Sequence, residues 1–153
     1  MFSATDDEET IYLKRNDSEN LLSSYHTSGF KLDDAKWPSV EHYYQGMKFE
    51  QRELCDNIRS AADSSTAAKL ASKNKRKIRK DWKKIKRTIM TRGLYVMFRT
   101  HPGAAEELLR TENSKLVEQS QYDYYWGCGR DLRGENVYGQ ILMEIREKLR
   151  DID

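Results

Sequence analysis

Cysteine, histidine and long apolar segments are all scarce in this chain of 153 residues. The two cysteines, Cys55 and Cys128, stand far apart and form no C-x-x-C pattern, so neither a disulfide framework nor a zinc site is expected. The three histidines show no metal-ligand spacing. No apolar run approaches the length of a membrane span, and the acidic N-terminus lacks the apolar core of a signal peptide. We therefore predict a cytoplasmic protein that has no membrane contact and binds no metal.

An excess of charge of one sign is also missing, because the net charge is only +2 at pH 7. The composition, 37% hydrophobic and 34% charged, is polar but is not that of a disordered chain. A chain of this length can bury a real core and usually forms one domain. We expect residues 1–8 to be a flexible N-terminus and residues 9–153 to form a single domain.

The spacing of apolar residues and turn formers predicts a series of short elements. A hairpin is expected over residues 29–37, because apolar and polar residues alternate around Asp33-Asp34, a pair that suits a tight turn. In chain order the predicted elements are a strand at 10–13, this hairpin, a helix from Ser39 that ends between 52 and 57, a helical piece around Ile58, a helix capped at 64–66, a long helix capped by Asp81, a helix from Pro102, a strand at 115–118, a loop at 122–136 and a final helix capped by Asn136.

The segment 37–49 opens the first of these helices. Pro38 and Ser39 suit a helix start. Two stripes follow at helical spacing, an apolar one of Val40, Tyr43, Tyr44 and Met47 and a polar one of Glu41, Gln45, Lys48 and Arg52. The polar stripe is either an ordinary solvated helix face or part of a site. Aromatic residues at both ends of the stripe, and a second aromatic and acidic cluster near residue 123, favour a site.

Residues 73–87 hold ten lysines and arginines in fifteen positions. This run is a solvated helix flank, a phosphate site or a surface that binds the backbone of a nucleic acid. Arg79 is the best candidate for a phosphate ligand, since it lies three residues before Trp82, whose indole offers a flat face for a base. The near-neutral net charge favours a local phosphate site over a broad nucleic-acid groove.

Residues 122–136 form the second candidate region. Three glycines exclude a regular element there, yet four aromatic residues fall within five positions, which are costly to leave in water. The glycine spacing matches no phosphate-binding fingerprint. The region either plugs the core or forms the lip of a binding site, with Trp126 for stacking, Asp123 as a carboxylate and glycines that let a ligand approach the backbone.

Together the two regions offer the chemistry that a phosphorylated ribosyl-base compound needs. Carboxylates at Glu41 and Asp123 can hold ribose hydroxyls or stabilise an oxocarbenium-like centre. Lys48 supplies an amine, and Trp82 and Trp126 can sandwich a base.

Several motifs, taken in order, resemble the YbiA-like, or NADAR, family of N-glycosidases, and the resemblance covers residues 22–149. The motifs that carry it are Trp37-Pro38-Ser39-Val40-Glu41-His42, Gln45 with Lys48-Phe49, Arg79-Lys80-Asp81-Trp82, Asp123 with Trp126-Gly127, and Gly134-Glu135-Asn136. The resemblance implies a single compact α+β domain, mostly α-helical, with a small N-terminal β-hairpin or sheet. It also implies hydrolysis of an N-glycosidic bond without a metal or another cofactor.

Residue by residue, the resemblance implies that Glu41, Lys48 and Asp123 are catalytic. The substrate-binding residues that it implies are Trp37, Tyr44, Arg79, Trp82, Trp126, Gly127 and Asn136. Three positions depart from the family pattern, since Ser24 stands where asparagine is frequent, Met97 where lysine is common and Glu112 where glycine is frequent. These departures bear on the identity of the substrate more than on the reaction.

The substrates that the resemblance implies are phosphorylated ribosylamino-pyrimidine intermediates of riboflavin synthesis or, as in other branches of the family, ADP-ribose attached to guanine in nucleic acid. We predict an N-glycosidase that acts on a small phosphorylated ribosyl compound, with ADP-ribosylated nucleic acid as the second candidate partner. The alternatives are a non-catalytic module that binds ADP-ribose or a nucleotide, and a nucleic-acid-binding protein that uses residues 73–87.

Overall fold

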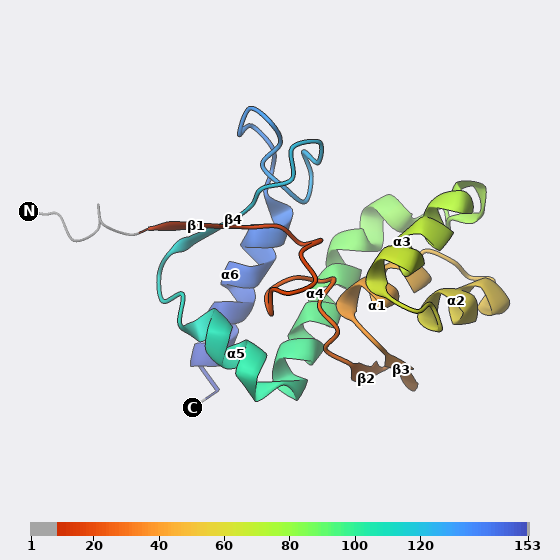
Figure 1. The fold of residues 1–153 in the computed structure, drawn as a ribbon, viewed down its shortest axis with the longest axis horizontal. Coiled ribbons are helices and arrows are strands. Elements are labelled where there is room, and N and C mark those ends of the chain that lie inside the picture. The colour runs from red at the N-terminus through yellow and green to blue at the C-terminus, as the bar shows by residue number, and fades with distance from the viewer. Residues whose placement is uncertain (1–8, 153) are drawn as a thin grey trace, which may run out of the picture. The chain divides into compact units, whose positions relative to one another are not determined.

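The computed structural model describes residues 9–152, so the predicted flexible segment 1–8 lies outside the described residues. The chain divides into two compact units. One consists of residues 16–101, and the other joins residues 9–15 to residues 102–152 (Figure 1). The predicted α+β class with mostly helical content is confirmed, and the sheets of the described part are two pairs of short strands.

The unit of residues 16–101 is organised around one short helix. Its elements are the strands β2 (Phe30–Leu32) and β3 (Ala35–Trp37) and the helices α1 (Val40–Gly46), α2 (Arg52–Arg59), α3 (Ser64–Lys73) and α4 (Trp82–Thr100). In Figure 1, α1 lies between α4 on one side and α2 and α3 on the other, and it packs against all three. All seven residues of α1 are buried, so its polar side chains must find their partners inside the protein.

The predicted hairpin is confirmed. β2 and β3 pair in antiparallel register, with Phe30 opposite Trp37. Asp33 and Asp34 form the two-residue turn, and both have positive φ angles of 54° and 62°. Such a turn twists with the strands that it joins, and aspartate is one of the few residues that tolerates this backbone region. The carboxylate of Asp33 also accepts a hydrogen bond from the guanidinium of Arg92 at 2.9 Å, which fastens the turn to α4.

The predicted length of the first helix is wrong, because α1 ends at Gly46 and not between residues 52 and 57. A Cβ atom at position 46 would lie only 3.0 Å from the ring of Trp37. Glycine allows this close approach, and it also weakens a helix. Lys48 and Arg52 therefore do not continue the helical row that Glu41 begins.

The other helices of this unit start close to the predicted positions, but two of the predicted caps differ. The cap of α3 is Asp63, whose carboxylate accepts from the backbone N–H of Thr66 at 2.7 Å. Asp81 precedes α4 and makes no side-chain cap bond. Its carboxylate instead pairs with Arg79, at 2.7 and 3.2 Å.

The second unit pairs two segments that are about a hundred residues apart in the sequence. Its elements are β1 (Thr10–Leu13), α5 (Pro102–Leu109), β4 (Lys115–Glu118) and α6 (Val137–Arg150). The strands β1 and β4 are parallel, and α6 packs against both β4 and α5 (Figure 1). Both strands and the start of α5 at a proline match the prediction.

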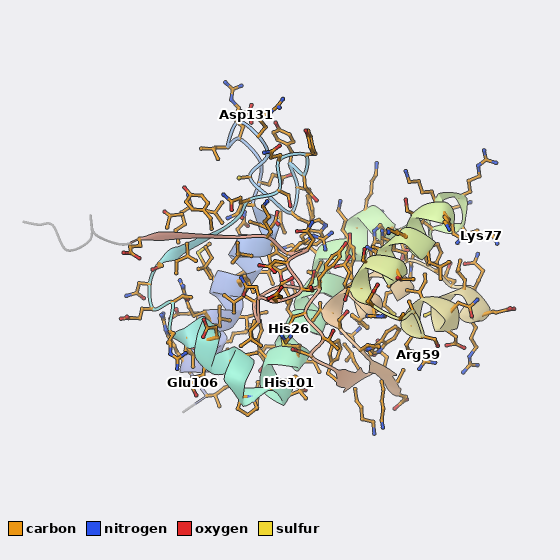
Figure 2. The ribbon with its side chains drawn as sticks, viewed as in Figure 1. His26, Arg59, Lys77, His101, Glu106 and Asp131 are labelled. Atoms are coloured by element: carbon orange, nitrogen blue, oxygen red, sulfur yellow. The ribbon has the colours of Figure 1, made fainter. Side chains whose placement is uncertain are left out.

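The core of this unit lies between the strand pair and the two helices. Leu108 of α5, Leu116 of β4 and Ile141 and Leu142 of α6 are fully buried. The segment 119–136 contains no helix or strand, as predicted, and Figure 2 shows Asp131 at the outer end of this loop. This long irregular segment thus begins directly after β4, which is held in place by its pairing with β1.

Candidate functional site

The carboxylate of Glu41 is fully buried in the first turn of α1. Its Oε1 accepts a hydrogen bond from Ser24 Oγ at 2.7 Å, and its Oε2 accepts one from Gln45 Nε2 at 2.6 Å. The backbone N–H of Glu41 donates to the carbonyl of Ser24 at 2.8 Å. Because removing a carboxylate from water is costly, these donors are needed to keep it inside the protein. They also fix the direction in which each oxygen points.

A second buried network holds the start of α1. Ser39 caps the helix by accepting from the backbone N–H of His42 at 3.1 Å. The ring of His42 contacts Ser39 Oγ through Nδ1 at 2.7 Å and the carbonyl of Ala61 through Nε2 at 3.1 Å. A carbonyl can only accept, so Nε2 carries a hydrogen, and in the neutral imidazole Nδ1 then accepts from the serine hydroxyl. Burial lowers the pKa of His42 below its ordinary value, which favours this neutral form.

Three further predicted residues of this unit form one cluster. The rings of Tyr44 and Trp82 lie 5.2 Å apart between centroids at an interplanar angle of 56°. The ammonium of Lys48 lies 5.2 Å from the centroid of Tyr44 and 6.0 Å from that of Trp82. These are cation–π distances. Tyr44 follows Glu41 by three residues on α1, so the cluster and the carboxylate lie on neighbouring parts of one helix.

Arg79 reaches this cluster through its backbone. Its N–H donates to the carbonyl of Lys48 at 2.8 Å, which ties the segment before α4 to the end of α1. Its guanidinium, however, binds both oxygens of Asp81. This hydrogen bonding raises the pKa of Arg79 and lowers that of Asp81. Asp81 thus occupies two of the five N–H donors of Arg79, and a phosphate at this arginine would share the guanidinium with Asp81 or displace it. Lys77, from the same basic run, lies at the outer surface in Figure 2.

Trp37 lies on a different face of α1 from Glu41. Its ring packs edge-on against Tyr43, with centroids 5.2 Å apart, and its Nε1 donates to the carbonyl of Leu32 at 2.9 Å. The guanidinium of Arg59 lies 5.9 Å from the ring centroid. The structure therefore groups Trp37 with the hairpin and α2, apart from the cluster of Tyr44, which was also predicted to bind substrate.

The other predicted residues belong to the second unit. Asp123 Oδ1 accepts from the backbone N–H groups of Tyr125 and Trp126 at 3.0 and 2.8 Å, so this oxygen shapes a turn. Trp126 is only 4% exposed, and the guanidinium of Arg15 lies 5.8 Å from its ring centroid. This burial agrees with the interpretation of Trp126 as a core residue under the loop, and the cation over its ring resembles the arrangement at Trp82.

Gly127 lies against a buried acid that the sequence did not single out as functional. A Cβ atom at position 127 would collide with Glu118 Oε1. The carboxylate of Glu118 is fully buried and accepts from the backbone N–H of Arg15 at 2.8 Å and from Ser120 Oγ at 2.8 Å. Gly127 is therefore required for close packing of the loop on the end of β4.

Asn136 does not cap α6 with its side chain, so that prediction is wrong. Its φ is 52°, and its amide turns to the edge of β4. There Oδ1 accepts from the N–H of Glu118 at 2.8 Å, and Nδ2 donates to the carbonyl of Leu116 at 2.9 Å. These bonds imitate a neighbouring strand. The amide of Asn136 thus has a structural task at the place where a substrate contact was predicted.

Of the two side chains that hold Glu41, the sequence placed Gln45 in the same polar stripe, because it follows Glu41 by four residues, the spacing at which helical side chains meet. No local pattern pointed to Ser24, which reaches Glu41 from an irregular segment seventeen residues earlier. Ser24 was noted only as a departure from the family pattern.

Residues 9–152 contain no group of three or more histidine, cysteine, aspartate or glutamate side chains that could hold a metal ion. None of the helices in this part of the chain combines the length and the apolar character of a membrane span. Cys55 and Cys128 both carry free thiols.

Known proteins share both the sequence motifs and the fold of this chain. The model of the NADAR domain matches residues 2–150. An N-glycosidase of Nostoc punctiforme is 37% identical over 134 residues, which are 86% of this chain and 86% of that protein. The N-glycosidase YbiA of Escherichia coli is 33% identical over 138 residues, 90% of this chain and 86% of the relative. The solution structure of E. coli YbiA superimposes with a TM-score of 0.83 at 32% identity and covers 94% of this chain and 86% of that one.

A longer relative carries a name that refers to riboflavin biosynthesis. A riboflavin biosynthesis protein of Vibrio vulnificus is 32% identical over 145 residues, which are 94% of this chain but only 40% of that protein. The fold and the relatives of similar length define a hydrolase that acts on N-glycosyl bonds. The chain belongs to the NADAR family.

Proposed function

We propose that the protein hydrolyses the bond between the anomeric carbon of a phosphorylated ribose and the nitrogen of a base or amine. The substrates that we favour are the phosphorylated ribosylamino-pyrimidine intermediates of riboflavin synthesis, and an ADP-ribosyl base is the second candidate. The name of the Vibrio relative supports the first of these. We place the reaction in the cytoplasm, in keeping with the two free and isolated thiols.

The observation that carries this proposal is the buried carboxylate of Glu41. Cleavage of an N-glycosidic bond builds positive charge on the anomeric carbon and the ring oxygen as the nitrogen departs. A carboxylate in a site that excludes water stabilises this charge far more than it would in solution. Because Ser24 and Gln45 already hold both oxygens, the carboxylate does not have to reorganise during the reaction. Glu41 stabilises the cation or orients the water that captures it.

The overall reaction balances without any further reactant. Water adds its hydroxyl group to the anomeric carbon, and its remaining hydrogen goes to the leaving nitrogen, which keeps the electron pair of the broken bond. Glu41 is fully buried, so a substrate reaches it only after the surrounding side chains shift. Lys48 has a long side chain and is only partly buried, so it can move with little loss of packing.

The aromatic cluster beside α1 suits the rest of the substrate. Trp82 and Tyr44 offer ring faces for a base, and Lys48 offers a cation for a ribose or phosphate oxygen. Arg79 is the phosphate ligand in this proposal, by exchange of its bond to Asp81. The remaining candidates are Asp123 as the second carboxylate, and Trp37, Trp126, Gly127 and Asn136 as further substrate contacts.

The test is direct incubation of the protein with two substrates. One is a phosphorylated ribosylamino-pyrimidine, followed by the appearance of free ribose 5-phosphate. The other is ADP-ribosylated guanosine, followed by free ADP-ribose. Release of either product supports the proposal and names the substrate class. Tight binding without release would instead support a non-catalytic ADP-ribose or nucleotide module. Salt-sensitive binding to oligonucleotides without turnover would support a nucleic-acid-binding role for residues 73–87.

A further inference from the structure

Within the described part of the chain, one buried oxygen atom beside the Glu41 carboxylate has no hydrogen-bond partner. Gln45 is 5% exposed, and its Nε2 donates to Glu41 Oε2 at 2.6 Å. This bond fixes the orientation of the amide, because the reverse orientation would set two oxygens against each other. The Oε1 atom of Gln45 is therefore also buried, and it has no hydrogen-bond partner among residues 9–152.

A buried carbonyl oxygen without a donor is uncommon in folded proteins and calls for an explanation, such as a catalytic role or a bound ion or water molecule. The neighbouring polar groups of α1 are satisfied from within the protein. Ser39 and His42 bond to each other, and Glu41 accepts from Ser24. The amide of Gln45 differs from them, since it uses one end to hold Glu41 and keeps the other end for a donor that the described residues do not supply.

We propose that Oε1 of Gln45 accepts a hydrogen bond from the substrate, and that Gln45 thereby selects a donor group next to the anomeric carbon. The inference rests on the proposed function, which sets the anomeric carbon beside Glu41. Because Oε1 and Nε2 are bonded to the same carbon, the selected donor lies close to the atoms that Glu41 faces. Gln45 is thus a specificity-determining residue as well as a partner of the Glu41 carboxylate.

Two donors flank the anomeric carbon of a ribosylamine, the 2-hydroxyl group and the N–H of the linking nitrogen. A carbonyl oxygen accepts from either of them. A site built to bond such a donor discriminates strongly against an analogue that lacks it, because its own acceptor is then left buried and unpaired. The experiment therefore compares two pairs of ligands, one pair for each of these donors.

The first arm measures affinity by calorimetry for ribose 5-phosphate and for 2-deoxyribose 5-phosphate. The second arm compares the ribosylamino-pyrimidine phosphate, whose linking nitrogen carries a hydrogen, with uridine 5-monophosphate, whose linking nitrogen carries none. We expect the wild-type protein to prefer the donor-bearing ligand in one arm by roughly 10- to 100-fold. The Gln45→Met variant, which has a similar length and no amide oxygen, should lose that preference.

The matched control is Ser24→Ala. It removes one hydrogen bond to Glu41, as Gln45→Met does, but it leaves Oε1 of Gln45 in place. If Gln45 only supported Glu41, both variants would lower affinity and keep the ratio between the paired ligands. On our proposal Ser24→Ala keeps the ratio and Gln45→Met abolishes it. Gln45→Glu, whose protonated carboxyl group donates its hydroxyl to Glu41 and keeps a carbonyl oxygen at this position, should also keep the ratio.

The inference is overturned if the wild-type protein shows no preference in either arm, or if Gln45→Met shows the same preference as the wild type. Oε1 would then hold a structural water molecule only. If Gln45→Met fails to fold, the affinity ratios of the wild-type protein and of Gln45→Glu test the inference. Turnover is measured separately, so that a protein with the expected ratios but no product release disproves the proposed function and leaves the ligand contact standing.

Discussion

Ser24 and Glu41 are joined by two hydrogen bonds. The carbonyl of Ser24 accepts from the N–H of Glu41 at 2.8 Å, and the hydroxyl of Ser24 donates to Oε1 of Glu41 at 2.7 Å. Ser24 is also one of the three positions that the sequence resemblance marks as a departure from the family pattern. The serine at this position therefore affects how the Glu41 carboxylate is held, because its hydroxyl group donates its hydrogen bond to Glu41.

Replacement of Glu41 by glutamine should remove catalysis and spare the fold. The change keeps size and polarity but removes the charge that stabilises the cationic transition state. We expect kcat to fall by about a thousandfold or more, while the melting temperature and the affinity for product stay close to those of the wild type. Steady-state kinetics, calorimetry and thermal melting measure the three quantities.

The control for this variant is Glu106→Gln on α5, which makes the same chemical change on an exposed side chain paired with Arg110. It should leave kcat unchanged. Near-normal kcat in Glu41→Gln would move the catalytic role to Asp123. Unfolding of Glu41→Gln would show that the carboxylate serves the helix start.

Arg79 should bind the phosphate group of the substrate. Arg79→Ala should raise KM strongly, whereas Lys84→Ala, in the same basic run, should change KM little. Asp81→Asn offers a third comparison, because it weakens the pair that now occupies the Arg79 guanidinium. If phosphate competes with Asp81, this variant should lower KM. Equal increases of KM in Arg79→Ala and Lys84→Ala would point to diffuse electrostatic steering.

Ligand binding should quench tryptophan fluorescence through Trp82. Its indole lies in the cluster with Tyr44 and Lys48, and base–aromatic stacking contributes about 1–3 kcal/mol per base. Trp82→Phe should remove most of the quenching and weaken binding. The prediction that Trp126 also contacts the base is tested in parallel. If Trp126→Phe is fully active but melts at a lower temperature, Trp126 only fills the core.

Gly127→Ala should destabilise the protein by about 1–3 kcal/mol, because the added methyl group would overlap the buried carboxylate of Glu118. Gly103→Ala is the matched control. Nothing lies within 4 Å of a Cβ atom at that position of α5, so the same change should be neutral or stabilise the helix by about 0.5–1 kcal/mol. Urea titration of both variants measures the difference. A Gly127→Ala variant as stable as the wild type would show that the loop can move away.

Stability should decrease on mild acidification because of His42. Burial lowers its pKa from the ordinary 6.5, so the folded protein binds this proton less readily than the unfolded chain does. The contribution of neutral His42 is complete above about pH 6.5 and is lost as the pH falls through the lowered pKa. His42→Gln can keep a donor for the carbonyl of Ala61 and does not titrate. Its melting temperature should therefore fall less steeply between pH 7.5 and 5, in about the range where histidine titrates, and an equal slope would disprove the assignment.

The parts of the fold that could be predicted from sequence are those with local causes. The Asp33-Asp34 turn, the start of α5 at Pro102 and the strands β1 and β4 are set by residues within a few positions of each other. The end of α1 could not be predicted, because the ring of Trp37, which packs closely against Gly46, comes from another element. The periodic spacing of apolar residues along one helix carries no information about a contact with a ring from another element.

The candidate site divides in the same way. The motif around Glu41 singles out the carboxylate, but the partner Ser24 comes from a segment with no regular structure. Asn136 was expected to cap α6, which is what its place before a helix suggests. Its amide instead bonds to the backbone of β4 at Leu116 and Glu118. The sequence does not show that β4 and the start of α6 lie side by side in the fold.

The parallel pairing of β1 with β4 has a consequence for how the protein forms in the cell. A ribosome adds about 5–20 residues per second, so β1 emerges several seconds before β4 exists. Residues 16–101 are complete in that interval and form a unit of their own. The strand β1 must stay unpaired and uncommitted until Lys115–Glu118 has been made. Slow translation between these segments would prolong the time in which an exposed strand edge can meet another chain.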